Sequence, residues 1–84
     1  MRTLEARFYP RAKAGGRFVT IGRVVCADGS VAIHPDNVSD RSVSPFPLAD
    51  LQTKLQFFVD SMAAGRADDL LTMKSDFWSF IELS

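Results

Sequence analysis

The stretch FVTIGRVVCADGSVAIH, residues 18–34, decides the fold of this 84-residue chain. Its β-branched residues favour two strands, one on each side of Asp28-Gly29. That dipeptide is typical of a two-residue hairpin loop, because it tolerates positive φ at both loop positions. The hairpin then places Ala27 opposite Ser30 and fixes the register of the two strands.

The predicted register gives the hairpin two faces that are both partly apolar. One face carries Phe18, Val24, Cys26, Val31 and Ile33. The other face carries Val19, Ile21, Val25 and Ala32. One face must be core. We expect the other, represented by Val19, Ile21 and Val25, to be covered by the following loop, by a protein partner or by a second copy of the chain in a homodimer.

The flanking segments complete a small α+β fold. Thr3–Tyr9 alternates apolar and polar residues, as a half-buried strand does. Apolar residues recur at helical spacing after Pro47, with Gly65 as the expected end of the helix. Residues 66–74 are ambiguous and can form a short second helix. Residues 77–83 are rich in aromatic and β-branched residues and favour a closing strand, with a helix as the competing interpretation.

The predicted order of elements is therefore β-β-β-α-(α)-β in a single domain over residues 1–84. The strands form a small antiparallel sheet, and one amphipathic helix packs on one face of it. The apolar stripe of that helix consists of Leu48, Leu51, Leu55, Phe58, Val59 and Met62.

Charge is divided by position, although the formal net charge is zero. Residues 1–23 carry six cations and one acid, a net of +5, whereas residues 24–84 carry four cations and nine acids, a net of −5. A basic end can meet nucleic acid or an acidic protein. The candidate contacts to a partner are Arg11, Lys13, Arg17 and Arg23, with Tyr9 and Trp78 as candidate aromatic anchors.

The chain offers few residues for catalysis or metal binding. Cys26 and His34 are its only cysteine and histidine, and the predicted register points them to opposite faces. A nucleophilic Cys–His pair and a zinc site are both disfavoured for that reason. We therefore expect no enzyme activity, no catalytic residue, no metal and no cofactor.

No signal segment and no apolar run of about 18 residues is present, so we expect a cytoplasmic protein that does not contact a membrane. The tail FWSFIEL, residues 77–83, resembles the final strand of a small type II anti-CRISPR protein, an aromatic-rich segment that closes on Glu-Leu. The small size, the α+β layout and the oppositely charged ends are also typical of such phage-borne inhibitors. The resemblance implies a protein that blocks a nucleic-acid-handling partner, in the host cytoplasm if the chain is phage-encoded, and it carries over no functional residue.

These observations favour a non-enzymatic interaction protein that binds and blocks or adapts a macromolecular partner, with a protein as the first expectation. The alternative is direct nucleic-acid binding through the basic N-terminal loop. The balanced net charge weighs against that alternative, because dedicated nucleic-acid binders are usually basic. Salt separates the two hypotheses, since phosphate binding predicts a steep loss of affinity as salt rises.

Overall fold

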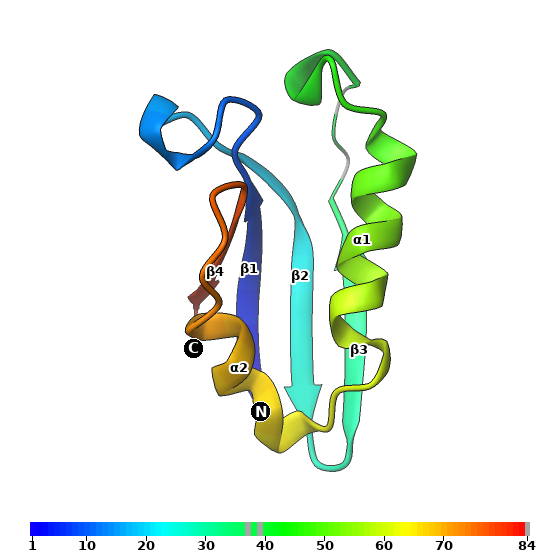
Figure 1. Ribbon diagram of the computed structural model, residues 1–84. Coiled ribbons are helices and arrows are strands. Elements are labelled where there is room, and N and C mark those ends of the chain that lie inside the picture. Colours follow the sequence, from blue (N-terminus) through cyan, green and yellow to red (C-terminus); the bar gives the residue numbers. More distant parts are fainter. Residues whose placement is uncertain (37, 39, 84) are drawn as a thin grey trace.

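The computed structural model describes residues 1–36, 38 and 40–83 and shows a four-stranded antiparallel sheet with two helices (Figure 1). The strands lie in the order β3-β2-β1-β4, which confirms the predicted α+β class. The elements are β1 (Arg2–Phe8), η1 (Lys13–Gly15), β2 (Val19–Ala27), β3 (Ser30–Pro35), η2 (Asp40–Val43), α1 (Leu48–Asp60), η3 (Ala64–Arg66), α2 (Ala67–Leu71) and β4 (Trp78–Glu82), where η marks a short 3-10 turn.

The β2–β3 hairpin has the register that the sequence predicts, with Ala27 opposite Ser30. Of the two loop residues, only Gly29 has a positive φ, at 70°. The turn therefore needs the left-handed backbone at one position rather than at both, and the expectation for Asp28 is wrong. The register is unaffected, since the loop still has two residues.

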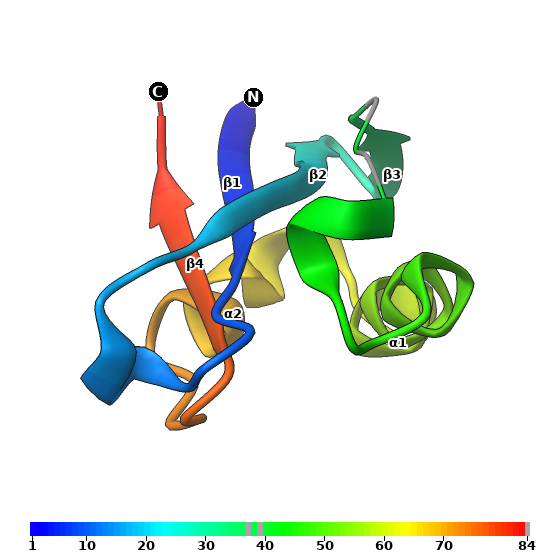
Figure 2. The same cartoon turned by 90° about the horizontal axis from the view of Figure 1, so that it is seen from above.

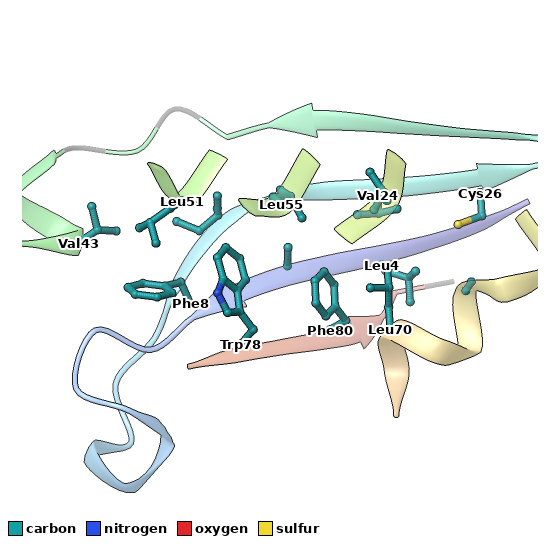
Figure 3. Packing of buried hydrophobic residues seen from close by; sticks show 14 residues of the cluster. Leu4, Phe8, Val24, Cys26, Val43, Leu51, Leu55, Leu70, Trp78 and Phe80 are labelled. Carbon is teal, nitrogen blue, oxygen red and sulfur yellow. The ribbon is translucent and has the colours of Figure 1, made fainter. Parts of the chain in front are cut away.

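Both helices lie on the same side of the sheet, and the other face is open in the described part of the chain (Figure 2). The predicted alternation of β1 is confirmed, because Leu4, Ala6 and Phe8 are buried beneath the helices. The amphipathic stripe of α1 and the short helix α2 cover them (Figure 3). The rest of the buried core consists of Ile21, Val24, Cys26, Val43, Leu51, Leu55, Val59, Ala67, Leu70, Trp78 and Phe80.

A bulge in β2 corrects the predicted assignment of faces. Ala6 pairs with Gly22 but Arg7 pairs with Thr20, so Ile21 is an extra residue without a partner on β1. An extra residue reverses the alternation of side chains along a strand. Ile21 is consequently fully buried, and Val19 packs against the core.

The expected exposed face of Val19, Ile21 and Val25 therefore does not form. Only Val25, half-buried opposite Ala32, lies on the open face of the sheet. Phe18, expected in the core, is 41% exposed, because it lies beyond the bulge.

Helix α1 ends at Asp60 rather than at Gly65, so the predicted end was wrong. The N–H of Met62 donates to the carbonyl of Val59 at 2.9 Å, which closes the last turn without a left-handed residue. The chain then turns toward α2, whose Leu70 is buried in the core. Within the described residues, no helix is long and apolar enough to cross a membrane.

Arg2 joins the two ends of the chain at one edge of the core. Its guanidinium contacts Glu82 of β4 at 2.7 Å and Asp68 of α2 at 2.8 Å. The hydrogen bond from Arg2 holds the pKa of Glu82 below its usual value. The stabilisation from Glu82 is thus present at neutral pH and is lost as the pH falls through that lowered pKa.

Gly22 is required by the close approach of β3. A Cβ atom at this position would lie 3.0 Å from the backbone oxygen of His34 and 3.2 Å from Cα of Pro35. Because backbone atoms of a paired strand cannot move aside easily, we expect Gly22→Ala to lower the free energy of unfolding by about 1–3 kcal/mol. Urea denaturation measures the change. Gly65→Ala is the control, since a Cβ there meets nothing within 4 Å, and an equal stability of both variants would contradict the expectation.

Candidate functional site

The segment between β1 and β2, residues 9–18, is a folded loop stabilised by its own backbone. The N–H of Ala12 donates to the carbonyl of Tyr9 at 3.1 Å, and the N–H of Gly16 donates to the carbonyl of Lys13 at 3.0 Å. Gly16 has a φ of 74°, which a glycine adopts without strain. The glycine turn predicted from the sequence is therefore present, as part of the 3-10 turn η1.

The same loop is attached to the segment that precedes β4. The N–H of Tyr9 donates to the carbonyl of Phe77 at 2.8 Å, and the N–H of Lys13 donates to the carbonyl of Asp76 at 2.7 Å. The loop is therefore held both by hydrogen bonds within it and by hydrogen bonds to the segment before β4. Its basic side chains are consequently carried by a preorganised backbone, which lowers the conformational cost of binding.

A hollow of about 200 Å³ lies between this loop and the segment around η2, and we call it the arginine hollow. Its lining residues are Pro10, Arg11, Arg17, Arg41, Ser42 and Ser44. The two segments meet at the same end of the molecule, at the top of Figure 1. Three arginine and two serine residues thus line one space, and the lining includes no aspartate or glutamate whose side chain the structure describes.

Two arginines of this loop differ from three arginines elsewhere in the fold in having no carboxylate partner among the described residues. Arg2, Arg7 and Arg66 form ion pairs with neighbouring carboxylates. Arg11 and Arg17 form no ion pair with any residue that the structure describes. Of the four cations in residues 1–23 that form no ion pair with a described residue, Arg11, Lys13 and Arg17 lie in this loop, so most of the unpaired positive charge of the basic segment is found there.

Arg41 was missed by the sequence reasoning. It lies in the acidic part of the chain, and the long connection after Pro35 has no pattern that places it beside the loop. Val43, fully buried, attaches this connection to the core, and Val38 packs against the same core. The signal in the sequence was the set of apolar residues in a polar segment, namely Val38, Val43 and Phe46.

A second hollow, of about 340 Å³, is lined partly by residues two positions away from lining residues of the first, and we call it the aromatic hollow. Its lining residues are Phe8, Phe46, Leu51, Lys54, Phe58, Ser75, Phe77 and Trp78. The rings of Phe46 and Phe77 are partly open to solvent, with 36% and 40% of each residue exposed. Figure 3 shows Phe8 and Trp78 side by side beneath α1.

The remaining predicted contacts are dispersed. Arg23 lies on the open face of the sheet, opposite His34, and does not line either hollow. Lys13 is exposed on η1 outside the arginine hollow. Trp78 is 4% exposed and belongs to the core, so it is not an exposed anchor. Tyr9 is half-buried, with its ring 5.8 Å from that of Phe18.

Cys26 and His34 lie apart, as the register predicts. Cys26 is buried under the helices, whereas His34 is exposed on the edge strand β3. Burial raises the pKa of the Cys26 thiol, so the reactive thiolate is scarce at neutral pH. Among the described residues, no group of three histidine, cysteine or acidic side chains is placed to hold a metal ion.

No protein-family model, curated protein or solved structure matches this chain.

Ala12 adopts a backbone conformation that favours glycine, with φ 61° and ψ 168°. Strain of this kind costs on the order of 1–3 kcal/mol in a non-glycine residue. We expect Ala12→Gly to raise the free energy of unfolding by about 1 kcal/mol, because relief of strain exceeds the added chain entropy. Thermal denaturation measures the change. Ala14→Gly, in η1 with an ordinary φ, should instead be neutral or destabilising, and a loss of stability in Ala12→Gly would refute the expectation.

The thiol of Cys26 is expected to react with Ellman's reagent much more slowly in the folded protein than in denaturant, because the thiol is buried and its pKa is raised. Absorbance at neutral pH follows the reaction. The double variant Cys26→Ala/His34→Cys moves the only thiol to an exposed position and should react rapidly. Equal rates for the two folded proteins would show that Cys26 is accessible.

Proposed function

We propose that this chain is a non-enzymatic interaction protein that binds an anionic surface of a macromolecular partner and thereby blocks or adapts that partner. The binding region is the basic end, defined as residues 9–18 together with residues 41–44. The observation that carries the proposal is the arginine hollow, where Arg11 and Arg17 face the same space as Arg41. Guanidinium groups are suited to carboxylate and phosphate groups, which they bind through paired hydrogen bonds.

The chemistry of the arginine hollow supports binding rather than catalysis. Its polar side chains are guanidinium groups and the hydroxyls of Ser42 and Ser44. A serine nucleophile needs an adjacent base, and the described lining holds neither a histidine nor a carboxylate. These groups can donate hydrogen bonds to an anion, but no described group in the lining can activate a nucleophile against it.

The partner implied by the resemblance of residues 77–83 is a nucleic-acid-handling complex, and a basic end is compatible with either its acidic protein surface or its nucleic acid. We do not extend the proposal to a homodimer. The apolar face expected to bind a second copy is reduced, since Ile21 is fully buried and Val19 packs against the core.

Charge reversal in the loop tests the proposal. We expect Arg11→Glu/Lys13→Glu to slow association with immobilised heparin and with immobilised poly-L-glutamate by about tenfold or more at low salt, because charge complementarity acts mainly on the association rate. Biolayer interferometry measures the rates. The affinity of the unaltered chain should fall as salt rises.

The matched control is Arg66→Glu. It reverses one charge, against two in the loop variant, in η3 at the far end of the molecule (Figure 1), where Arg66 is paired with Asp69. Its association rate should stay within about twofold of that of the unaltered chain, since screening weakens distant charges. Equal association rates for all three proteins, or no binding to either polyanion, would overturn the proposed function.

A further inference from the structure

We propose that the basic end binds single-stranded nucleic acid, with a phosphate group in the arginine hollow and a neighbouring base against the aromatic hollow. This inference rests on the proposed function and names the partner of the same site. The observation behind it is that the linings of the two hollows come within two residues of each other on two separate segments.

Two short segments connect the linings of the two hollows. On one segment, Phe8 lines the aromatic hollow and Pro10 lines the arginine hollow. On the other, Ser44 lines the arginine hollow and Phe46 lines the aromatic hollow. The rings of Phe8 and Phe46 are 5.2 Å apart between centroids, in an edge-to-face arrangement, so the two segments are in direct contact. Each hollow is therefore two residues from the other along both segments.

The arginine hollow has the donors that a phosphate group requires. Guanidinium groups of Arg11 and Arg17, unpaired within the described residues, offer paired N–H donors, and Ser42 and Ser44 add hydroxyl donors. Arg41 contributes a third guanidinium to the lining. The lining includes no aspartate or glutamate whose side chain the structure describes.

The aromatic hollow offers ring surface to a base. The rings of Phe46 and Phe77 are 6.2 Å apart between centroids and inclined at 64°, and both remain partly exposed. The ring of Phe77 stacks on the ring of the buried Phe8, with 6.3 Å between centroids and an interplanar angle of 20°. Phe8 thus holds the ring of Phe77 in place. Exposed aromatic rings beside a positive groove are the arrangement by which proteins bind single strands without reading their sequence.

Two competing partners use only part of this arrangement. An acidic protein surface would engage the guanidinium groups but has no need of the open rings. A duplex presents phosphates, but both faces of each base are already stacked within the helix. A single strand satisfies both hollows at once, because its bases are free to leave the stack.

The experiment measures the anisotropy of a fluorescein-labelled oligothymidylate of about 15 nucleotides, a common site size for single-strand binders. Three probes of equal length are compared: the oligothymidylate, an abasic oligonucleotide with the same phosphates, and a duplex. We expect the oligothymidylate to bind about tenfold or more tightly than the abasic strand, in keeping with the loss of one stacked base. It should also bind more tightly than the duplex.

Variants separate the two hollows. Arg11→Ala/Arg17→Ala should lower the slope of log affinity against log salt by about 1.4, at ~0.7 for each phosphate contact on a single strand. Phe77→Leu keeps apolar bulk but removes the ring, and should weaken binding by roughly tenfold. Phe77→Tyr keeps the ring and should retain affinity. Phe57→Leu is the matched control, since Phe57 is 77% exposed on α1 and lines neither hollow.

Trp78 supplies a second readout, because it is the only tryptophan and lines the aromatic hollow. Its emission should change on titration with the oligothymidylate and should not change with the abasic strand. Equal affinity for the oligothymidylate and the abasic strand, or tighter binding of the duplex, would overturn the inference. Binding to poly-L-glutamate without binding to the oligothymidylate would overturn this inference alone, whereas loss of binding to every polyanion would overturn the proposed function as well.

Discussion

The basic end of this protein depends on one extra residue in β2. Ile21 has no partner on β1, and its insertion reverses the side chains that precede it in the strand. Val19 therefore meets Phe8 on the core side, while Phe18 emerges on the open side under the guanidinium of Arg7, 4.3 Å from the ring centroid. The loop that carries the arginines leaves the sheet at this point. A bulge beside a binding region is a common means of redirecting a strand.

Most of the fold was predictable because its signals are local. The alternation in Thr3–Tyr9, the turn at Asp28-Gly29 and the stripe through Leu51 and Leu55 each specify an element within a few residues, and the structure has each of them. The bulge was not predictable, because a glycine at position 22 marks a close approach without saying which residue is extra. Only part of the candidate site could be predicted, because the other part is brought there by tertiary contacts and not by local sequence. Arg11 and Arg17 stand in a dense basic segment, but Arg41 reaches them through tertiary packing of Val43.

The division of charge along the sequence is not the division of charge in space. Arg2 belongs to the basic segment, yet its partners Glu82 and Asp68 come from the acidic part of the chain. Arg7 is paired with Glu5 on the open face of the sheet. Folding thus pairs the cations along β1 and leaves Arg11, Lys13 and Arg17 of the loop without an ion pair to any described residue, which explains how a chain without net charge can still present a cationic end.

The strand order has a consequence for how the chain acquires its fold. β1 lies inside the sheet, and its outer partner β4 pairs Leu4 with Glu82 across nearly the whole sequence. Contacts of such long sequence separation form late, because the entropy of closing the intervening loop must be met first. A nascent chain lacking β4 would therefore expose one backbone edge of β1. The unpaired N–H and C=O groups of such an edge can pair with a strand of another chain. During synthesis, the β2–β3 hairpin can form early, whereas the complete sheet has to wait for the final strand to leave the ribosome.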